Sequence, residues 1–433
     1  MPREVLMNAF LPASGIEDPH RFAGRSTEIE ELTNALIVKG SIPLIYGQRG
    51  LGKSSLALQL SRIAQGDVEL LSELELEDLA LLASDRFITF YINCSDSTKN
   101  LRGLLQLMIN SVESLKDEKV REGMKGEHRL VDKTTKRGIS LKVFSTETTK
   151  RYSAELAAMD TTKFSPEELL VRLSETLTDV FGQRVLFVVD ELDRMKNTSG
   201  LASFLKSYSS EYLKFVLVGI GTTEGDLLRD HASLSRQLVA VGVNQMTKVE
   251  LESIVERTEE FLAENGESYT FTRSARENLA RISSGFPWFV HVIGQAALLQ
   301  VAKDGTTSVE QTHVRSVIES LATRRLARQY YDKYNKAVRD SSPREFVLRA
   351  FAQWPDEDVP TSVVYPKLKA LGVAAPSNYL GHLTQEHCGY ILSPSPRQSR
   401  LYRFSDEMFK IYVRMRPSVY LGVDDDVRDA FKA

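Results

Sequence analysis

The sequence has 433 residues, which predicts about three domains, each long enough to bury a core of its own. Apolar residues make up 42% and charged residues 26%, as in ordinary globular proteins, and the formal net charge of −3 means that any nucleic-acid binding must come from a local patch. Cys94 and Cys388 do not make a disulfide framework, and the seven histidines show no metal-ligand spacing. The residues after Met1 lack the long apolar core typical of a secretory signal, and no apolar run reaches the roughly 18 residues of a membrane span. We therefore expect a cytoplasmic protein without a zinc site.

The first segment, residues 1–21, is predicted to be an irregular lead-in. A helix is expected after it, because Ser26 can cap a helix, the first turn is acidic, and apolar residues recur at helical spacing up to Leu36. Such a helix could pack beside a nucleotide base, or it could be an ordinary capped helix. From the spacing alone, both readings stay open.

The most specific motif follows the apolar run at 42–46. The spacing G-x-x-x-x-G-K-S predicts a phosphate-binding loop between a strand and a helix, the helix being expected over 55–63. Glycines let the backbone amides face inward, and the helix start directs its own amides and dipole toward an anion. Lys53 is expected to reach the β- and γ-phosphates, and Ser54 to hold Mg²⁺. The alternative, a chance glycine-rich turn, is disfavoured by this context. The loop consists of Gly47, Gln48, Arg49, Gly50, Leu51, Gly52, Lys53, Ser54 and Ser55.

Strands and helices alternate in the residues that follow. An acidic helical excursion at 68–84 precedes a predicted strand at 87–94 and a helix at 101–114, which indicates a parallel sheet covered on both faces. Residues 117–163 interrupt this rhythm, since they are polar and locally basic, with an extended-looking run at 138–144. This insertion could be a hairpin that contacts DNA or a partner, or a solvated and partly disordered segment.

Two carboxylates follow the next strong strand. A helix at 166–181 leads to the unbroken apolar run 184–191, which is typical of a strand buried on both faces. Asp190 and Glu191 stand at its carboxyl end, where open α/β sheets bind ligands. We expect Asp190 to orient Mg²⁺ through water and Glu191 to act as general base. The alternative is a plain turn at the end of a strand. The presence of the phosphate loop in the same chain favours the metal-and-base interpretation over that alternative.

Two weaker candidates follow. After a strand at 215–220, Thr222 or Thr223 could sense the γ-phosphate, although threonine also suits a helix cap. Arg236 precedes the strand-like residues 238–243 and could reach the nucleotide of a neighbouring subunit, or it could form a surface ion pair. Neither alternative is excluded by the sequence.

From residue 248 onward the sequence predicts mostly helices. They are expected over 248–264, 272–283 and 288–302, with Pro287 near the start of the third and Ser308 as a candidate cap of a helical stretch to 338.

Three further helices and a hairpin at 390–404 indicate a C-terminal winged helix. The three helices are expected over residues 343–354, 361–371 and 376–386. Arg397, Arg400 and Arg403 lie on or beside the hairpin and could contact phosphates, but a protein-docking role is equally open. The acidic tail after residue 420 is predicted to be disordered.

These motifs resemble those of the AAA+ ATPases near the initiator and STAND groups, over roughly residues 20–340. Gly47–Ser55 resembles Walker A and Val185–Glu191 resembles Walker B. The resemblance implies ATP and Mg²⁺ as cofactors. It also implies an adenine-side box at Phe22–Arg25 that includes Phe22 and Arg25, and a lid turn whose Pro287 touches the base.

The segment from His231 to Arg236 is similar to the H-x-S-x-x-R element of some bacterial members. Two departures stand out. The usual sensor asparagine is absent, which leaves Thr222, and the lid helix carries His291 where an arginine is usual. Slow or partner-dependent hydrolysis is therefore expected.

The sequence thus predicts an α/β fold: a P-loop NTPase parallel sheet (AAA+ core) with a helical lid and a C-terminal winged-helix domain. The expected boundaries are 1–246 for the core, 247–340 for the lid and linker helix, 341–420 for the winged helix and 421–433 for the tail. The expected function is an ATP-hydrolysing switch coupled to a protein partner or DNA, with a homo-oligomer as one assembly and no membrane contact. The alternatives are an ATP-licensed DNA-binding initiator or regulator, and a gating subunit for a separate effector protein.

Overall fold

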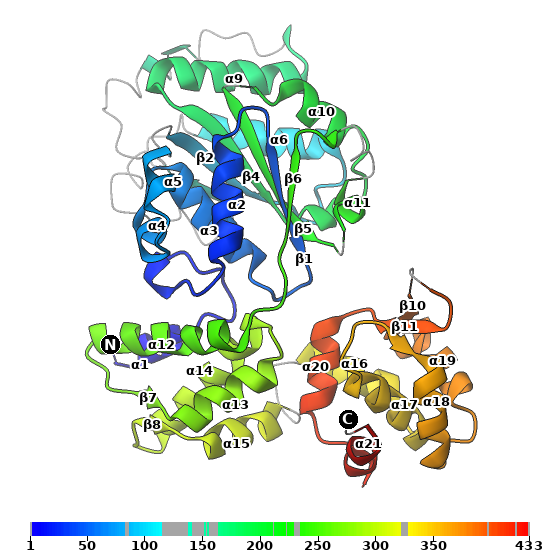
Figure 1. The fold of residues 1–433 in the computed structure, drawn as a ribbon. Helices are drawn as coiled ribbons and strands as arrows, with labels where there is room; N and C mark the ends of the chain where they lie inside the picture. Colours follow the sequence, from blue (N-terminus) through cyan, green and yellow to red (C-terminus); the bar gives the residue numbers. More distant parts are fainter. Residues whose placement is uncertain are drawn as a thin grey trace. The chain divides into compact units, whose positions relative to one another are not determined.

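The structure is a computed structural model in which the chain forms two compact units (Figure 1). We call Ala13–Asn244 the α/β unit, and Met1–Pro12 together with Gln245–Ala433 the C-terminal unit. Most of the predicted insertion at 117–163 lies outside the described residues. The structure describes residues 2–82, 86–114, 137–140, 151–152, 154–155, 163–210, 212–221, 223–228, 234–321, 328–395, 398–420 and 422–431.

A six-stranded sheet runs through the described residues of the α/β unit, in the order β3-β2-β4-β5-β1-β6 (Figure 1). Neighbouring strands are parallel except that the edge strand β3 pairs antiparallel with β2. The predicted parallel sheet is confirmed, and β3 falls in the extended-looking part of the insertion. The strands are β1 (Ile42–Gly47), β2 (Phe87–Asn93), β3 (Arg137–Ser140), β4 (Arg184–Asp190), β5 (Leu213–Ile220) and β6 (Leu238–Gly242).

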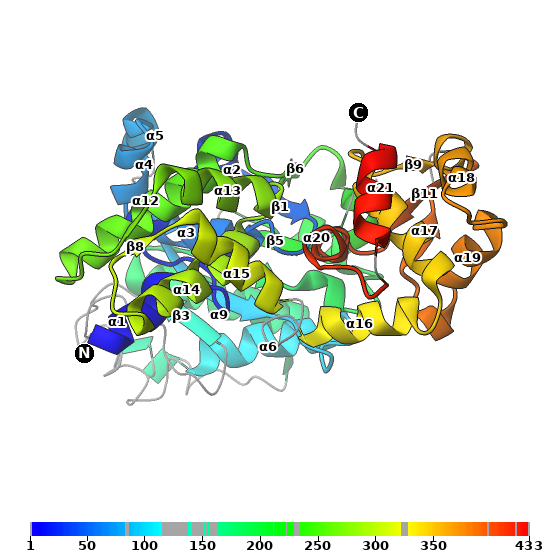
Figure 2. The ribbon, with the colours of Figure 1, turned by 90° about the horizontal axis from the view of Figure 1, so that it is seen from below.

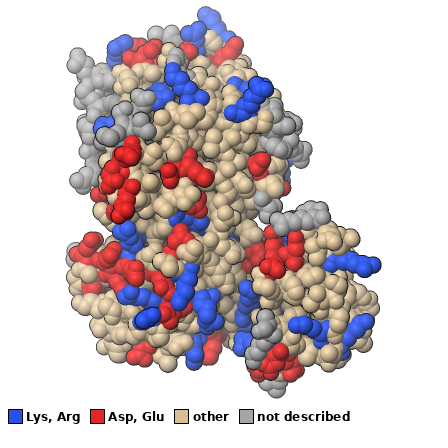
Figure 3. All heavy atoms as spheres, in the orientation of Figure 1, with Lys and Arg blue, Asp and Glu red and all other residues tan. Residues whose placement is uncertain are grey.

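Helices cover both faces of this sheet, as predicted. Helices α2 and α3 pack on one face, and α6, α9 and α10 pack on the other. The acidic side chains of α4 and α5 gather on one flank of the unit (Figure 3). The helices are α2 (Ser26–Ile37), α3 (Lys53–Ala64), α4 (Glu69–Glu73), α5 (Glu77–Leu82), α6 (Leu101–Glu113), α9 (Pro166–Phe181), α10 (Leu201–Tyr208) and α11 (Glu224–Leu227), with short 3₁₀ turns η1 (Pro19–Arg21) and η4 (Leu192–Arg194).

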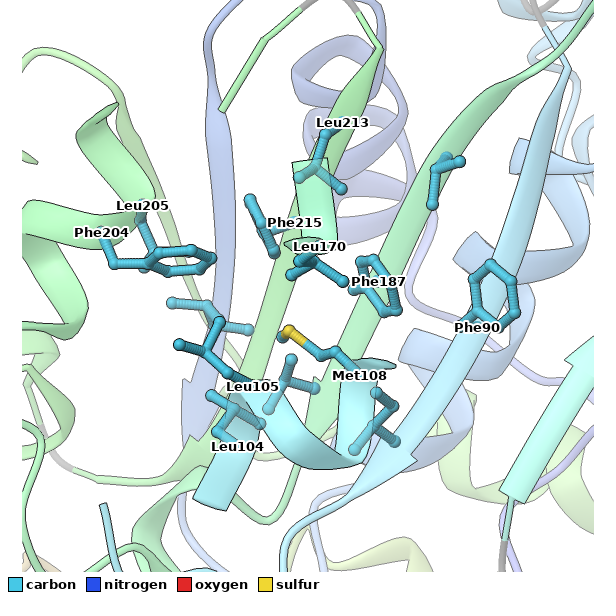
Figure 4. Packing of buried hydrophobic residues seen from close by; sticks show 14 of the residues in the cluster. Phe90, Leu104, Leu105, Met108, Leu170, Phe187, Phe204, Leu205, Leu213 and Phe215 are labelled. Atoms are coloured by element: carbon cyan, nitrogen blue, oxygen red, sulfur yellow. The ribbon is translucent and has the colours of Figure 1, made fainter. Parts of the chain in front are cut away.

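Aromatic side chains on three adjacent strands form the centre of the core (Figure 4). Phe187 of β4 stacks on Phe90 of β2 with ring centroids 5.1 Å apart and on Phe215 of β5 with centroids 6.1 Å apart. Phe204 of α10 meets the Phe215 ring edge-on at 5.5 Å. These rings cross the strands at one level, so they fix the lateral positions of β2, β4 and β5 and hence of the strand ends that carry polar residues.

A buried lysine joins the start of β5 to the end of α2. The Lys214 ammonium, near the start of β5, donates to the carbonyls of Ala35 (2.9 Å) and Val38 (2.7 Å) at the end of α2, and also to that of Leu36. Burial lowers the pKa of Lys214 to about 7, while the three carbonyls and the negative end of the helix dipole favour its charged form.

The first residues of the chain form a helix, so the predicted irregular lead-in is wrong for residues 2–9. Helix α1 (Pro2–Ala9) packs on α14, and the fully buried Phe10 lies where a Cβ on Gly294 would come within 2.6 Å of its ring. The Trp288 indole donates to the Pro12 carbonyl at 3.0 Å. This burial is long-range, which explains why local residue types gave no sign of it.

The helices after residue 247 match the predicted ones. Two predicted caps are wrong, one in this region and one at the start of α2. Ser308 lies in β8 (Ser308–Val309), which pairs with β7 (Thr270–Phe271), and therefore does not cap a helix. Ser26 is the first residue of α2 rather than its cap. Acidic and basic side chains alternate over α12 (Figure 3). The helices are α12 (Lys248–Glu264), α13 (Arg273–Ser283), α14 (Pro287–Lys303) and α15 (Gln311–Leu321).

The last part of the chain contains three helices followed by a hairpin, and the hairpin and a third short strand pair in the order β10-β11-β9. This order of elements is consistent with a winged helix. The elements are α16 (Arg328–Val338), α17 (Ser342–Gln353), β9 (Val359–Pro360), α18 (Thr361–Ala370), α19 (Pro376–Leu383), the 3₁₀ turn η6 (Glu386–Cys388), β10 (Leu392–Pro394), β11 (Leu401–Phe404), α20 (Glu407–Met415) and α21 (Val423–Phe431). Among the described residues, no helix is both long and apolar enough to cross a membrane.

The acidic tail is a packed helix, so the prediction of disorder is wrong for residues 423–431. Helix α21 lies beside α17 (Figure 2), with Val423 and Val427 buried. Arg349 of α17, only 1% exposed, forms an ion pair with Asp424 and donates to Glu345 at 3.2 Å. The buried guanidinium needs carboxylate partners, and the tail supplies one of them.

This contact gives a prediction for the tail. Replacing Asp424 by Asn removes the charge opposite Arg349, which we expect to cost about 1–3 kcal/mol of local stability. Hydrogen exchange of the amides of residues 423–431 should accelerate at least about fivefold. Asp425→Asn, on the exposed side of the same helix, should change the exchange little. Equal exchange in both variants would contradict the role of the ion pair.

Candidate phosphate-binding site

Three strand ends bring the predicted loop and the predicted acidic pair to one edge of the sheet. Strand β5 lies between β1 and β4, and Gly47 of β1 is level with Ile220 of β5. Asp190 ends β4, level with Asn93 of β2. Because these strands are parallel, their carboxyl ends share an edge, and ligands bind there in open α/β sheets.

The loop has the backbone of an anion cradle. Gly50 and Gly52 adopt positive φ values of 80° and 90°, which residues with a Cβ rarely adopt. A Cβ on Gly47 would come within 2.6 Å of the Val243 carbonyl oxygen, so glycine is required there as well. Helix α3 begins at Lys53, and no side chain caps its first turn within this fully described loop. The first amides of α3 are therefore available to an anion.

Lys53 is held at this loop. Its side chain is 8% exposed, and the ammonium donates to the Gln48 carbonyl at 2.7 Å. Burial lowers the pKa of Lys53 to about 8; the charges of Asp190 and Asp193 oppose this shift, and the exposed Arg49 adds to it. The ammonium is thus poorly solvated in the free protein and would gain from an anionic ligand.

The Asp190 carboxylate is fixed by two donors, one of which the sequence did not reveal. Its Oδ1 accepts the Glu191 amide at 2.7 Å, and its Oδ2 accepts the Tyr91 hydroxyl at 2.6 Å. The Ser54 side chain in turn interacts with the side chain of the same tyrosine. Burial and the negative charge of Asp190 raise the pKa of Tyr91 well above its ordinary value, so the hydroxyl stays protonated and donates. Tyr91 therefore joins the two residues predicted to hold Mg²⁺.

Glu191 occupies an unusual backbone position and forms an ion pair. Its φ of 56° places it in the left-handed region, which costs about 1–2 kcal/mol for a residue with a Cβ. Its Oε2 lies 2.9 Å from the Nε of Arg194, whose Nη1 lies 3.8 Å from Asp96 Oδ1. The Asp193 carboxylate accepts the Ile220 amide at 2.8 Å and so connects the turn after β4 to the end of β5. The sequence assigned no role to Asp193 or Arg194.

Among the residues that resemble an adenine-side box, Arg25 contacts the loop. Arg25 is 6% exposed and donates to the Leu51 carbonyl (3.1 Å), the Asn244 carbonyl (2.7 Å) and Glu28 (2.7 Å). Phe22 is also buried. The described contacts of Arg25 are thus those of a clamp on the loop backbone, while its predicted nucleotide contact stays a prediction.

The Ser55 side chain hydrogen-bonds to a neighbouring segment, residues 15–17, and not to the residues of the site. Its hydroxyl accepts the Ile16 amide at 3.0 Å, and Gln59 donates to the Ile16 carbonyl at 2.8 Å. The segment lies so close to α3 that a Cβ on Gly15 would approach Leu58 to 2.7 Å. Of the two adjacent serines, only Ser54 is joined to Tyr91 and through it to Asp190.

Arg236 lies near the amino-terminal ends of the strands, whereas the loop follows the carboxyl end of β1. It is exposed in the turn before β6, where Leu238 is level with Ile42, at the start of β1 rather than at its end. Five residues of strand, roughly 17 Å, separate that level from Gly47. Arg236 therefore cannot serve the phosphate loop of its own chain.

Two other predicted site residues, Thr223 and Pro287, lie in elements outside the phosphate loop. Thr223 forms a capping box with Asp226, which supports the helix-cap reading for it. Pro287 is the first residue of α14, in the C-terminal unit, and His291 of the same helix accepts the Leu11 amide at 3.3 Å.

The predicted wing arginines differ from one another. Arg400 is exposed, while Arg403 is paired with Glu357 at 3.3 Å. Thr222 and Arg397 lie outside the described residues.

The donors near the loop suit a hydrated Mg²⁺ ion. Hydroxyl and carboxylate oxygens are the ligands that Mg²⁺ prefers, and the ion commonly keeps several waters. Ser54 and Asp190 supply one group of each kind, linked through Tyr91. Among the described residues, no cluster of three or more His, Cys, Asp or Glu side chains is arranged as a metal site.

The loop and the acidic pair both lie in a stretch of the chain that matches one family model. Residues 38–224 match the family model described as the AAA domain. No curated protein matches the chain.

Several solved structures resemble the whole chain. The ORC2 protein of Aeropyrum pernix in its ADPNP-ADP complexes is 14% identical, with a TM-score of 0.47, covering 94% of this chain and 93% of that one. The Aeropyrum pernix ORC1 protein in complex with DNA is 16% identical, with a TM-score of 0.45 and coverages of 99% and 96%. The RuvB Holliday junction branch migration motor of Thermotoga maritima is 15% identical, with a TM-score of 0.40 and coverages of 90% and 94%. These scores lie below 0.5, so the likenesses say nothing of what this chain binds.

The position of Tyr91 gives a prediction. Tyr91→Phe removes one of the two donors to the buried Asp190 carboxylate, which should lower the free energy of unfolding by about 1–3 kcal/mol. Tyr46→Phe, on strand β1 of the same sheet, removes a hydroxyl that forms no hydrogen bond with the described residues and should be nearly neutral. Thermal unfolding of the two variants measures the difference. A Tyr91 variant as stable as the Tyr46 variant would contradict the bridging role.

Proposed function

We propose, from the premise that residues 38–224 form an AAA domain, that the chain binds Mg²⁺-ATP and hydrolyses it as a nucleotide-dependent switch. The observation that carries this proposal is the meeting, at one sheet edge, of a loop with open helix amides and the Asp190–Glu191 pair. A nucleotide polyphosphate has the negative charge and the length that such an edge can bind.

Each residue then has a chemical role. The amides of Gly50 to Ser54 and the Lys53 ammonium hold the phosphates, and Ser54 and Asp190 hold the hydrated ion. When bound between these groups, Mg²⁺ would supply positive charge that offsets the negative charge of the phosphates. Glu191 polarises a water that attacks the γ-phosphorus, and the bond to the β-bridging oxygen breaks to give ADP and phosphate.

The Glu191–Arg194 ion pair bears on the rate. The Arg194 guanidinium occupies the Glu191 carboxylate, with its Nε 2.9 Å from Oε2. Glu191 can polarise water fully only when it turns away from Arg194. This requirement supports slow or partner-stimulated hydrolysis.

Assembly into a homo-oligomer is part of the proposal. Arg236 lies at the sheet edge remote from its own loop and forms no ion pair with the described residues. An exposed guanidinium there could stabilise phosphoryl transfer only on a neighbouring copy.

The switch is proposed to act through the C-terminal unit on duplex DNA or on a protein partner. Loss of the γ-phosphate changes the contacts that hold a core and lid together in such switches. An ATP-licensed DNA-binding initiator or regulator, and a gating subunit for an effector, are the alternatives. A stoichiometric protein partner recovered without DNA would select the gating role.

The catalytic assignment has a direct test. Lys53→Ala should weaken ATP binding by about tenfold or more, because a charge-assisted contact to phosphate is lost. Glu191→Gln should retain ATP binding and lose turnover by about a hundredfold or more, because the amide cannot act as a base. Calorimetry measures binding and phosphate release measures turnover. Equal turnover by the wild type and Glu191→Gln would exclude Glu191 as the base.

The Lys53 environment predicts a pH dependence of binding. With its pKa lowered to about 8, Lys53 loses its proton in the free protein as the pH rises through 8, whereas bound phosphates favour the ammonium. ATP affinity should therefore fall above about pH 8, approaching tenfold per pH unit, and binding there should take up a proton. Lys53→Arg, which stays charged, should bind without this dependence. A pH-independent wild-type affinity between about pH 7 and 9 would contradict the lowered pKa.

A further inference from the structure

Five basic side chains from two separate stretches of the sequence gather at the carboxyl end of α19. We call them the α19 basic patch: Lys336, Arg339, Arg344, His382 and His387. Arg339 donates to the His387 carbonyl at 3.0 Å, and the His382 Nδ1 lies 3.2 Å from the His387 Nε2. Arg344, near the start of α17, donates to the Cys388 sulfur at 3.3 Å. Four elements thus contribute, namely α16, α17, α19 and η6.

The patch is positive and has no acidic partner among the described residues. No ion pair joins Lys336, Arg339 or Arg344 to a carboxylate there, although Asp340 and Glu386 are close in sequence. Arg339, Arg344 and Lys336 all act on His387 as positive charges. Cations elsewhere in the same unit do have partners. Arg349 pairs with Asp424, Arg403 with Glu357 and Lys410 with Glu407.

We propose that the α19 basic patch binds the phosphate backbone of duplex nucleic acid. Lys336 and Arg339 are exposed and Arg344 is half-buried. Like charges gathered at one place without carboxylate partners repel one another, and a polyanion removes that repulsion. Helix α19 carries no carboxylate, and Ser377 and Asn378 on its exposed face offer a hydroxyl and an amide to base edges. An acidic peptide would need the cations but not this neutral polar face beside them.

The proposal extends the duplex-DNA alternative of the proposed function, on which it rests only for the class of partner. It assigns the backbone contact to α16, α17 and η6 rather than to the hairpin arginines. Arg403 is already paired with Glu357.

The His382–His387 pair makes the affinity for a duplex depend on pH. A ring-to-ring hydrogen bond of 3.2 Å requires one neutral imidazole, because a nitrogen must accept. Desolvation and the charges of His382, Arg339, Arg344 and Lys336 lower the pKa of His387. A phosphate backbone nearby supplies negative charge and raises the pKa of His387. The bound state therefore takes up protons, and affinity rises as the pH falls through about 6.5.

The test uses the whole chain and a fluorescently labelled duplex of roughly 30 base pairs, a length beyond one helical turn of about 10. Fluorescence anisotropy gives affinity as a function of salt. Replacing Lys336 and Arg339 by Gln should weaken binding about tenfold or more and reduce the slope of log affinity against log salt by about two units. The matched control, Lys303→Gln with Arg315→Gln, removes two exposed cations on α14 and α15 and should leave both quantities unchanged.

A second variant keeps the proposal testable if the first perturbs the fold. His382→Gln with His387→Gln should retain binding at about pH 8 but lose most of the gain that the wild type shows at about pH 6. Three results would overturn the proposal: no duplex binding by the wild type, equal losses in the patch and control variants, or a loss confined to Arg400→Gln. Phosphate release by the same variants separates failure of this site from failure of the ATPase proposal.

Discussion

The Asp190 carboxylate is the group on which the candidate site depends. It is buried at the end of β4, and each of its oxygens accepts a hydrogen bond, from the Glu191 amide and from the Tyr91 hydroxyl. Its charge also opposes the desolvation of Lys53. Through Tyr91 it is linked to Ser54 of the phosphate loop. The stacked rings of Phe90, Phe187 and Phe215 hold the strands level, and so the hydrogen bonds between neighbouring strand ends can form.

The loop and the acidic pair could be predicted from the sequence because their chemistry is local. Gly50 and Gly52 have the positive φ values that the spacing of glycines implies, and Asp190 follows an unbroken apolar run. Tyr91 could not be predicted, since its contact with Asp190 depends on β2 lying next to β4. Arg25 was expected at the nucleotide from a family resemblance, yet the contacts described for it include backbone carbonyls of Leu51 and Asn244.

The C-terminal unit shows the same division between local and long-range information. Its helices could be predicted from apolar periodicity. The order of the acidic tail could not, because it depends on the ion pair between Asp424 and the buried Arg349. Phe10 likewise orders the first residues by filling the space above Gly294. A net charge of −3 gave no sign of the α19 basic patch, whose members are separated by up to 51 positions between Lys336 and His387. Only the packing of four elements brings them together.

The central claim is that the loop at Gly47–Ser55 binds a nucleotide polyphosphate together with Mg²⁺. Calorimetric titration of the whole chain with a slowly hydrolysed ATP analogue, with and without Mg²⁺, tests it most directly. The account predicts one site per chain, with tighter binding when Mg²⁺ is present, because Ser54 and Asp190 then contribute through the ion. Absence of binding at about 1 mM analogue in the presence of Mg²⁺, at the weak end of the usual affinity range, would contradict it.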